Sequence, residues 1–270
     1  MLQPIDRRTF IADLGKGAFA LAVVSLAACS PGAQATTRPS SSAAGSTPGA
    51  PGSQPPPSES SASGSPPGAA PPAGDDLAWR RVNLGFVSAY VLVRGGQAAV
   101  VDTGVGGSAG SIEDALAEVG AGWSAVIDVI LTHKHNDHIG SLADVMDLAP
   151  DAIGYAGAED IPSISAPREL TQVGDGDTVF GLRIVTTPGH TPGSISVYDA
   201  ANGILVAGDA LRVEGGKPTL PGAQFTEDMD EAARSIAKLG ELTFETLLVG
   251  HGDPIESGAG AAVTELAAQQ

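Results

Sequence analysis

The sequence has 270 residues, of which 42% are hydrophobic, and a formal net charge of −17 at pH 7. So acidic a chain lacks the lysine and arginine stripe with which proteins neutralise phosphates, and we therefore expect no nucleic-acid partner. The length suffices for one substantial hydrophobic core, and composition leaves the oligomeric state open.

The first 28 residues have the pattern of an export signal. Two arginines, Arg7 and Arg8, precede an uncharged apolar run over residues 18–28. This run is shorter than the roughly 20 apolar residues that a membrane-spanning helix needs. The string RRTFI at residues 7–11 resembles a twin-arginine signal. The string LAAC that ends at Cys29 resembles the bacterial lipobox, so we predict cleavage after residue 28.

Cys29 is the only cysteine of the chain, which excludes an intramolecular disulfide. A buried thiol at the end of an apolar helix is the alternative, but no globular sequence surrounds this residue. Lipidation accounts better for an unpaired thiol in an exported protein. We therefore expect a lipid on Cys29 to anchor the protein to the outer face of the cytoplasmic membrane or to the cell envelope.

The segment 29–74 is predicted to be a disordered tether. Residues 30–74 consist mainly of Pro, Ser, Gly and Ala, and only Arg38 and Glu59 carry charge. Such a composition has too little apolar surface to offset the entropy lost on ordering. A Pro-rich recognition segment for a partner protein is the alternative interpretation.

The remaining residues, 75–270, form the predicted globular domain. Hydrophobic patterns predict strands at 89–93, 98–101, 126–131, 182–186, 194–198, 204–207 and 246–249. They predict helices at 111–119, about 141–148, about 228–239 and at the C-terminal end. Two β-rich halves with outer helices indicate an α/β (α+β) protein in which two sheets pack together and helices cover them.

Four potential metal ligands follow the predicted strand 126–131, in the string THKHNDH at residues 132–138. If the chain stays extended, His133 and His135 point to the same side and can hold one ion, whereas Lys134 points away. The turning chain then delivers Asp137 and His138 elsewhere. A solvated histidine-rich loop is the alternative.

The other two histidines, His190 and His251, also lie in Gly/Pro turns directly after predicted strands. All five histidines of the chain thus follow strand ends, from which rigid elements can aim them at a common point. Asp209 ends another apolar strand, and its carboxylate can bridge two cations; a helix N-cap is its alternative role. Asp102, in the string VDTG, is expected to orient a ligand loop rather than to bind metal.

The strings THKHNDH, TPGHTPGS, AGDA and GHG, in this order and downstream of VDTG, resemble the metallo-β-lactamase superfamily. The resemblance covers residues 80–255 and implies a four-layer αβ/βα sandwich. It implies one metal ion at His133, His135 and His190, and a second at Asp137, His138 and His251. Asp209 would bridge the two ions. Zinc is the expected metal, with iron and manganese as alternatives.

The resemblance implies a binuclear hydrolase of a small-molecule substrate. A hydroxide shared by two ions would cleave an ester, thioester, lactone or similar acyl bond, with Asp137 as the catalytic base. The alternatives are a β-lactamase, an oxidoreductase with one iron that is similar to persulfide dioxygenases, and a metal-binding or sensory lipoprotein without turnover. Arg212 stands where related lactonases often carry a tyrosine, and the helical substrate domain of glyoxalase II is not expected after His251.

We expect Cys29→Ser to release the protein from membranes without damage to the globular domain, because the tether separates the two. Fractionation of cells that express each form measures this. A variant that stays with the membrane and is processed as before would contradict the lipoprotein prediction.

Overall fold

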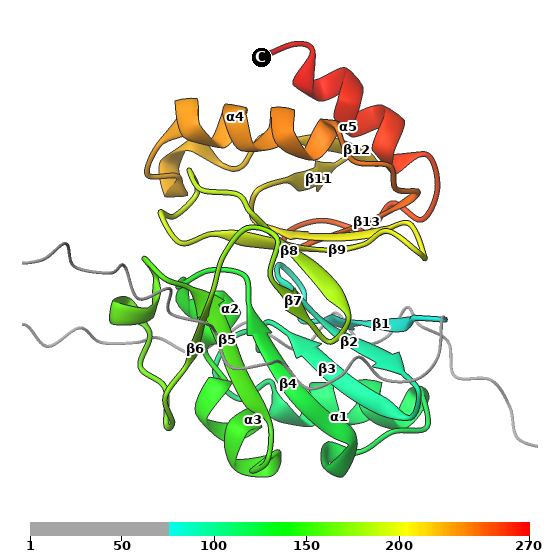
Figure 1. Cartoon of the computed structure of the whole chain (residues 1–270), viewed down its shortest axis with the longest axis vertical. Helices are drawn as coiled ribbons and strands as arrows, with labels where there is room; N and C mark the ends of the chain where they lie inside the picture. Colours follow the sequence, from blue (N-terminus) through cyan, green and yellow to red (C-terminus); the bar gives the residue numbers. More distant parts are fainter. Residues whose placement is uncertain (1–75) are drawn as a thin grey trace, which may run out of the picture. The chain divides into compact units, whose positions relative to one another are not determined.

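The computed structural model describes residues 76–270 of the chain (Figure 1). The predicted export signal (1–28), Cys29 and the tether (29–74) lie outside the described residues and stay predictions. Within residues 76–270, no helix is long and apolar enough to cross a membrane.

The described residues form two large sheets and a small hairpin. The first sheet has the order β1 (Ala78–Asn83), β2 (Ser88–Arg94), β3 (Gln97–Val101), β4 (Val126–Leu131), β5 (Ile153–Gly157) and β6 (Thr171–Val173). The second has the order β13 (Thr246–Val249), β10 (Ile204–Gly208), β9 (Ile195–Asp199), β8 (Leu182–Thr186) and β7 (Thr178–Val179). The hairpin pairs β11 (Arg212–Glu214) with β12 (Lys217–Thr219).

Helices cover the outer face of each sheet, as Figure 1 shows. α1 (Ala109–Glu118) and α3 (Leu142–Leu148) lie against the first sheet, and α4 (Met229–Gly240) and α5 (Ala259–Ala267) lie against the second. Short helices complete the fold: α2 (Asn136–Ile139), η1 (Trp123–Ala125), η2 (Ile161–Ser163) and η3 (Ala223–Phe225). The predicted αβ/βα sandwich is confirmed.

Three apolar layers separate these elements, one between the sheets and one beneath each pair of helices. Strand β2 shows how the sequence produces them. Its Ala89 and Val91 pack toward α1, whereas Tyr90 and Leu92 pack toward the second sheet. Because both faces of the strand are buried, its sequence is a continuous apolar run without polar alternation.

The local sequence also explains where helix α4 begins and which of its faces is buried. The Asp228 carboxylate accepts a hydrogen bond from the backbone N–H of Glu231 at 2.9 Å and caps the helix. The buried face repeats at helical spacing through Ala232, Ile236 and Leu239. The start of α4 is therefore well defined, and it lies directly after the segment that carries Thr226.

Strand directions bring the predicted ligands to one edge. β10 runs parallel to β13 and antiparallel to β9, which is antiparallel to β8, so β8, β10 and β13 all end at the same edge of the second sheet. The end of β4 joins this edge, because the N–H of Ile195 donates to the Thr132 carbonyl at 2.9 Å. The loops that follow these four strands consequently meet.

A buried ion pair joins the sheets on their inner side. Arg94 of β2 donates from Nη2 to the Asp199 carboxylate of β9, and the two side chains are only 7% and 4% exposed. Arg94 also donates to the Phe180 carbonyl at 3.3 Å. Removing one member of a buried pair leaves the other charge without compensation.

We predict that Arg94→Met lowers the free energy of unfolding by roughly 3–5 kcal/mol, as measured by urea denaturation. The matched control is Arg80→Met, which breaks an ion pair to Glu118 whose side chains are 48% and 63% exposed and should cost less than about 1 kcal/mol. Equal losses in the two variants would contradict the bridging role of Arg94.

Candidate metal centre

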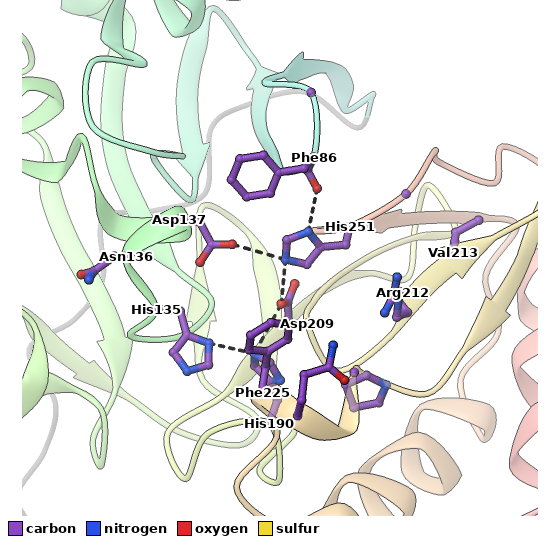
Figure 2. Close-up of a pocket in the computed structure, with 15 residues that line it drawn as sticks. Phe86, His135, Asn136, Asp137, His190, Asp209, Arg212, Val213, Phe225 and His251 are labelled. Carbon is purple, nitrogen blue, oxygen red and sulfur yellow. Dashed lines mark hydrogen bonds and ion pairs between the residues drawn. The ribbon is translucent and has the colours of Figure 1, made fainter. Parts of the chain in front are cut away.

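All seven predicted metal ligands meet at the shared edge of the two sheets. Three groups of side chains have ligand atoms within 4.8 Å of one another. They are His133, His135 and His190; Asp137, His138 and His251; and His133, His138 and Asp209. Figure 2 shows His135, Asp137, His190, Asp209 and His251 around one cavity. The expected clustering of these residues is thus present in the structure.

The first group consists of three imidazoles that face one another. His133 Nε2 lies 3.1 Å from His135 Nδ1, and His190 Nε2 lies 2.9 Å from the same atom. His133 and His135 come from the end of β4, and His190 comes from the loop after β8. Lys134, between the first two, directs its Nζ to Glu227 Oε1 at 2.7 Å. It therefore points away from the ligands, as alternation predicts.

The second group combines a carboxylate with two imidazoles. His251 Nε2 is 3.4 Å and His138 Nε2 is 4.0 Å from Asp137 Oδ2. Asp137 and His138 lie on helix α2, which forms within the predicted polar loop. His251 reaches them from the end of β13.

Asp209 lies between the two groups. Its Oδ2 is 3.3 Å from His190 Nε2 and 3.2 Å from His251 Nε2, and its Oδ1 is 3.4 Å from His138 Nε2. One carboxylate thus contacts members of both groups. The alternative of a helix N-cap is wrong for Asp209, since a turn and strand β11 follow it.

The arrangement fits cations. His138 Nε2 and Asp209 Oδ1 are buried and have no hydrogen-bond partner, and such buried polar atoms require compensation. In the first group, three ring nitrogens converge at hydrogen-bond distance, where unprotonated nitrogens would present lone pairs to one another. Nitrogen and carboxylate ligands of this kind suit zinc and related divalent metals.

The ring nitrogens that face away from the centre are fixed by hydrogen bonds. His138 Nδ1 lies 2.8 Å from Asp102 Oδ2, and His251 Nδ1 lies 2.7 Å from the Phe86 carbonyl. His133 Nδ1 contacts Thr132 Oγ1 at 3.1 Å, and His190 Nδ1 contacts Thr226 Oγ1 at 3.2 Å. Metal-binding histidines are commonly oriented in this way, which leaves Nε2 for the ion.

Asp102 contacts His138 and Thr132 from behind the two histidine groups, at the place where the sequence predicts an orienting residue. Besides His138, it accepts hydrogen bonds at 2.8 Å from both the backbone N–H and the hydroxyl of Thr132. Its backbone has a φ of 60°, an uncommon conformation for a residue other than glycine. Asp102 therefore links the two histidine groups from behind and does not belong to either.

Burial keeps two imidazoles in the form that binds metal. It lowers the pKa of His133 well below its usual value, and neighbouring imidazoles lower this pKa further. Burial also lowers the pKa of His190 to about 4, although Asp209 acts in the opposite direction. Both rings are consequently neutral at pH 7, with lone pairs available to a cation.

In the second group, neighbouring carboxylates raise the pKa of a histidine instead of lowering it. The hydrogen bond to Asp137 raises the pKa of His251 to about 10, and the same contact lowers the pKa of Asp137 to about 2. Burial alone would raise the pKa of Asp209, but His138 and His251 more than offset it and lower this pKa. A cation in this group would replace a proton between His251 and its two carboxylates.

A glycine permits the close approach of these groups. A Cβ added to Gly250, the residue before His251, would lie 2.1 Å from Asp209 Oδ1 and 2.5 Å from His138 Cε1. The GHG string therefore supplies both a ligand and the space in which two others meet.

A cavity of about 680 Å³ opens beside the cluster, a volume typical of small-molecule sites. The cavity is lined by Phe86 and Phe225, which are 63% and 66% exposed. In Figure 2 they lie on opposite sides of the contact between His251 and Asp209. Arg212 is the only lysine or arginine among its lining residues in the described part of the chain.

Several residues around the ligands could not be predicted from the sequence. The carbonyl of Phe86 and the hydroxyl of Thr226 act through contacts between distant segments, which no local motif signals. Asp160 is buried behind the first histidine group, again without a motif around it. For Arg212, the sequence showed only that an arginine stands where related lactonases often carry a tyrosine, and it did not predict a position in the cavity.

Comparisons with known proteins agree with this geometry. The metallo-beta-lactamase superfamily model matches residues 82–251. A probable metallo-hydrolase of Bacillus subtilis (strain 168), YflN, is 33% identical over 200 residues, which cover 58% of this chain and 75% of that protein. A hydroxyacylglutathione hydrolase of Gloeobacter violaceus is 33% identical over 153 residues, which cover 55% of this chain and 56% of that protein.

Among solved structures, a metallo-beta-lactamase family protein from Thermus thermophilus superimposes with a TM-score of 0.57 and 26% identity. The match covers 72% of this chain and 78% of that protein. Since the family model spans more than half of the chain, and the sandwich and the clustered ligand residues accompany it, this protein belongs to the metallo-β-lactamase superfamily.

Proposed function

We propose that this protein is a metal-dependent hydrolase that uses two divalent ions, most simply zinc, to cleave an ester, thioester, lactone or similar acyl bond. The observation that carries this proposal is the position of Asp209, whose two carboxylate oxygens face histidines of both ligand groups. The relatives with hydrolase names support the general reaction class.

The ligands divide between the ions as the distances suggest. His133, His135 and His190 would hold the first, Asp137, His138 and His251 the second, and Asp209 would bridge them. Two bound ions would lower the pKa of a water between them and would polarise the carbonyl of the substrate.

The remaining chemistry belongs to side chains of the chain. The Asp137 carboxylate lines the cavity and is partly exposed, so it can reach an attacking water from the solvent side. An ionised carboxylate within hydrogen-bond reach of such a water can accept its proton. The proton held at Asp137 can then pass to the leaving oxygen, sulfur or nitrogen.

The side chains that line the cavity also indicate which class of substrate it can hold. Phe86 and Phe225 offer apolar surface on two sides, and Arg212 offers a positive charge. Arg212 Nη2 is 2.7 Å from Glu214 Oε1, but both side chains are partly exposed and the pair is therefore weak. We propose an acyl substrate with an apolar part and a separate carboxylate that contacts Arg212.

We predict that Asp209→Ala binds one ion in place of two and loses at least about 100-fold in turnover, equivalent to roughly 3 kcal/mol of transition-state stabilisation. Metal analysis and ester hydrolysis measure the two effects. Asp175→Asn, which alters a solvent-accessible carboxylate paired with Lys238, should change neither. A variant at Asp209 with two ions and full rate would refute the bridge.

We predict that the unaltered protein hydrolyses esters, thioesters or lactones faster than β-lactams, in matched panels at defined metal content. Arg212→Gln should lower kcat/KM about 10-fold or more for a carboxylate-bearing ester, since hydrogen bonds to charged groups contribute about 1.5–3 kcal/mol. The neutral analogue should be unaffected. Arg183→Gln, at an exposed position of β8, is the control.

Efficient β-lactam turnover with negligible esterase activity would favour the β-lactamase alternative and contradict the acyl-ester proposal. If Arg212→Gln lowers kcat/KM equally for neutral and anionic esters, only the proposed contact between Arg212 and a substrate carboxylate is contradicted.

A further inference from the structure

Asp160 is a fully buried carboxylate that belongs to neither ligand group. It follows β5, where its N–H donates to the Gly157 carbonyl at 3.1 Å, and its exposed fraction is 0%. Its Oδ2 accepts hydrogen bonds from the Lys134 backbone N–H at 3.0 Å and from Thr191 Oγ1 at 2.5 Å. Its Oδ1 accepts from the Gly193 N–H at 3.0 Å.

These donors belong to the two segments that supply the first ligand group. Lys134 lies between His133 and His135, while Thr191 directly follows His190. One carboxylate therefore spans the two loops whose ring nitrogens must converge. We propose that Asp160 is a positioning residue that sets the geometry of the first ligand group and hence its affinity for a divalent ion.

An ion-pair network supports the same two segments. Lys134 Nζ lies 3.8 Å from Asp160 Oδ1 and 2.7 Å from Glu227 Oε1. The Glu227 N–H in turn donates to the His190 carbonyl at 3.2 Å. The nearby ammonium group of Lys134 supplies part of the charge compensation that a buried carboxylate requires.

The contacts of Asp160 are confined to this side of the centre. Within residues 76–270, its hydrogen bonds and ion pair involve Gly157, Ser163 and the segments 134 and 191–193. The second group is oriented by other atoms, namely Asp102 Oδ2 on His138 and the Phe86 carbonyl on His251. Loss of Asp160 should therefore affect the two ions unequally.

The approach of Asp160 depends on a small neighbour. A Cβ added to Gly193 would lie 2.5 Å from the Asp160 nitrogen and 2.7 Å from its Cγ. Gly193→Ala thus displaces the carboxylate without a change in its chemistry, and it provides a second, independent variant.

The test compares metal affinities of Asp160→Asn, Gly193→Ala and the unaltered protein by chelator competition with zinc, together with thermal unfolding. Asparagine has nearly the size of aspartate, but its amide nitrogen would face a backbone N–H in either orientation. We expect the affinity for the first ion to fall about 10- to 100-fold in both variants, while the affinity for the second ion stays within about 3-fold.

Asp199→Asn is the matched control, because Asp199 is also buried and accepts backbone hydrogen bonds from Ala201 and Asn202. It lies away from the ligand edge, since it pairs with Ile204 at the start of β10, whereas Asp209 follows the end of that strand. It should lower the unfolding temperature and leave both metal affinities unchanged.

Unchanged zinc affinity in both variants, or equal loss at the two ions, would overturn the role of Asp160. The inference rests on the proposed metal centre but not on the substrate. Absence of zinc binding by the unaltered protein would refute that centre, an outcome distinct from a failure confined to the variants.

Discussion

The structure depends on the convergence of five imidazoles and two carboxylates within one small, largely buried volume. Ring nitrogens of the first group lie 2.9 and 3.1 Å apart, and buried atoms such as His138 Nε2 have no hydrogen-bond partner. In a protein interior this arrangement is costly unless cations compensate it. The two sheets, the loop contacts and the orienting carboxylates all serve to maintain it.

Each of the two sheets supplies part of the ligand set. The first sheet supplies four ligands from one strand exit, and the second supplies single ligands from three strands that end at a common edge. Asp102 fixes the first half from behind, whereas Asp160 joins it to the second. The ligand geometry is thus determined by contacts between segments that lie far apart in the sequence.

Much of this could be predicted from local sequence. The strands 126–131, 182–186 and 246–249 have the predicted bounds, because each is a short run rich in β-branched and other apolar residues. Strand β1 could not be predicted, since half of its residues, AWRRVN, are polar and it lies at a sheet edge. Strand β5 was missed because IGYAG contains two glycines, which disfavour strands.

The ligands were predictable for a similar reason, because histidines and an aspartate directly after apolar strands form a pattern that can be seen in one segment at a time. Asp160 offers no such pattern, since its partners at 134 and 191–193 are brought to it only by the packed sheets. The same holds for the Phe86 carbonyl on His251, a contact between residues 165 positions apart.

The most direct test of the proposed binuclear centre is a metal titration of the metal-depleted protein, with ester hydrolysis followed at each addition. We expect two divalent ions to bind per chain and most of the activity to return with the pair. Binding of a single ion with full activity, or hydrolysis that persists without metal, would contradict it.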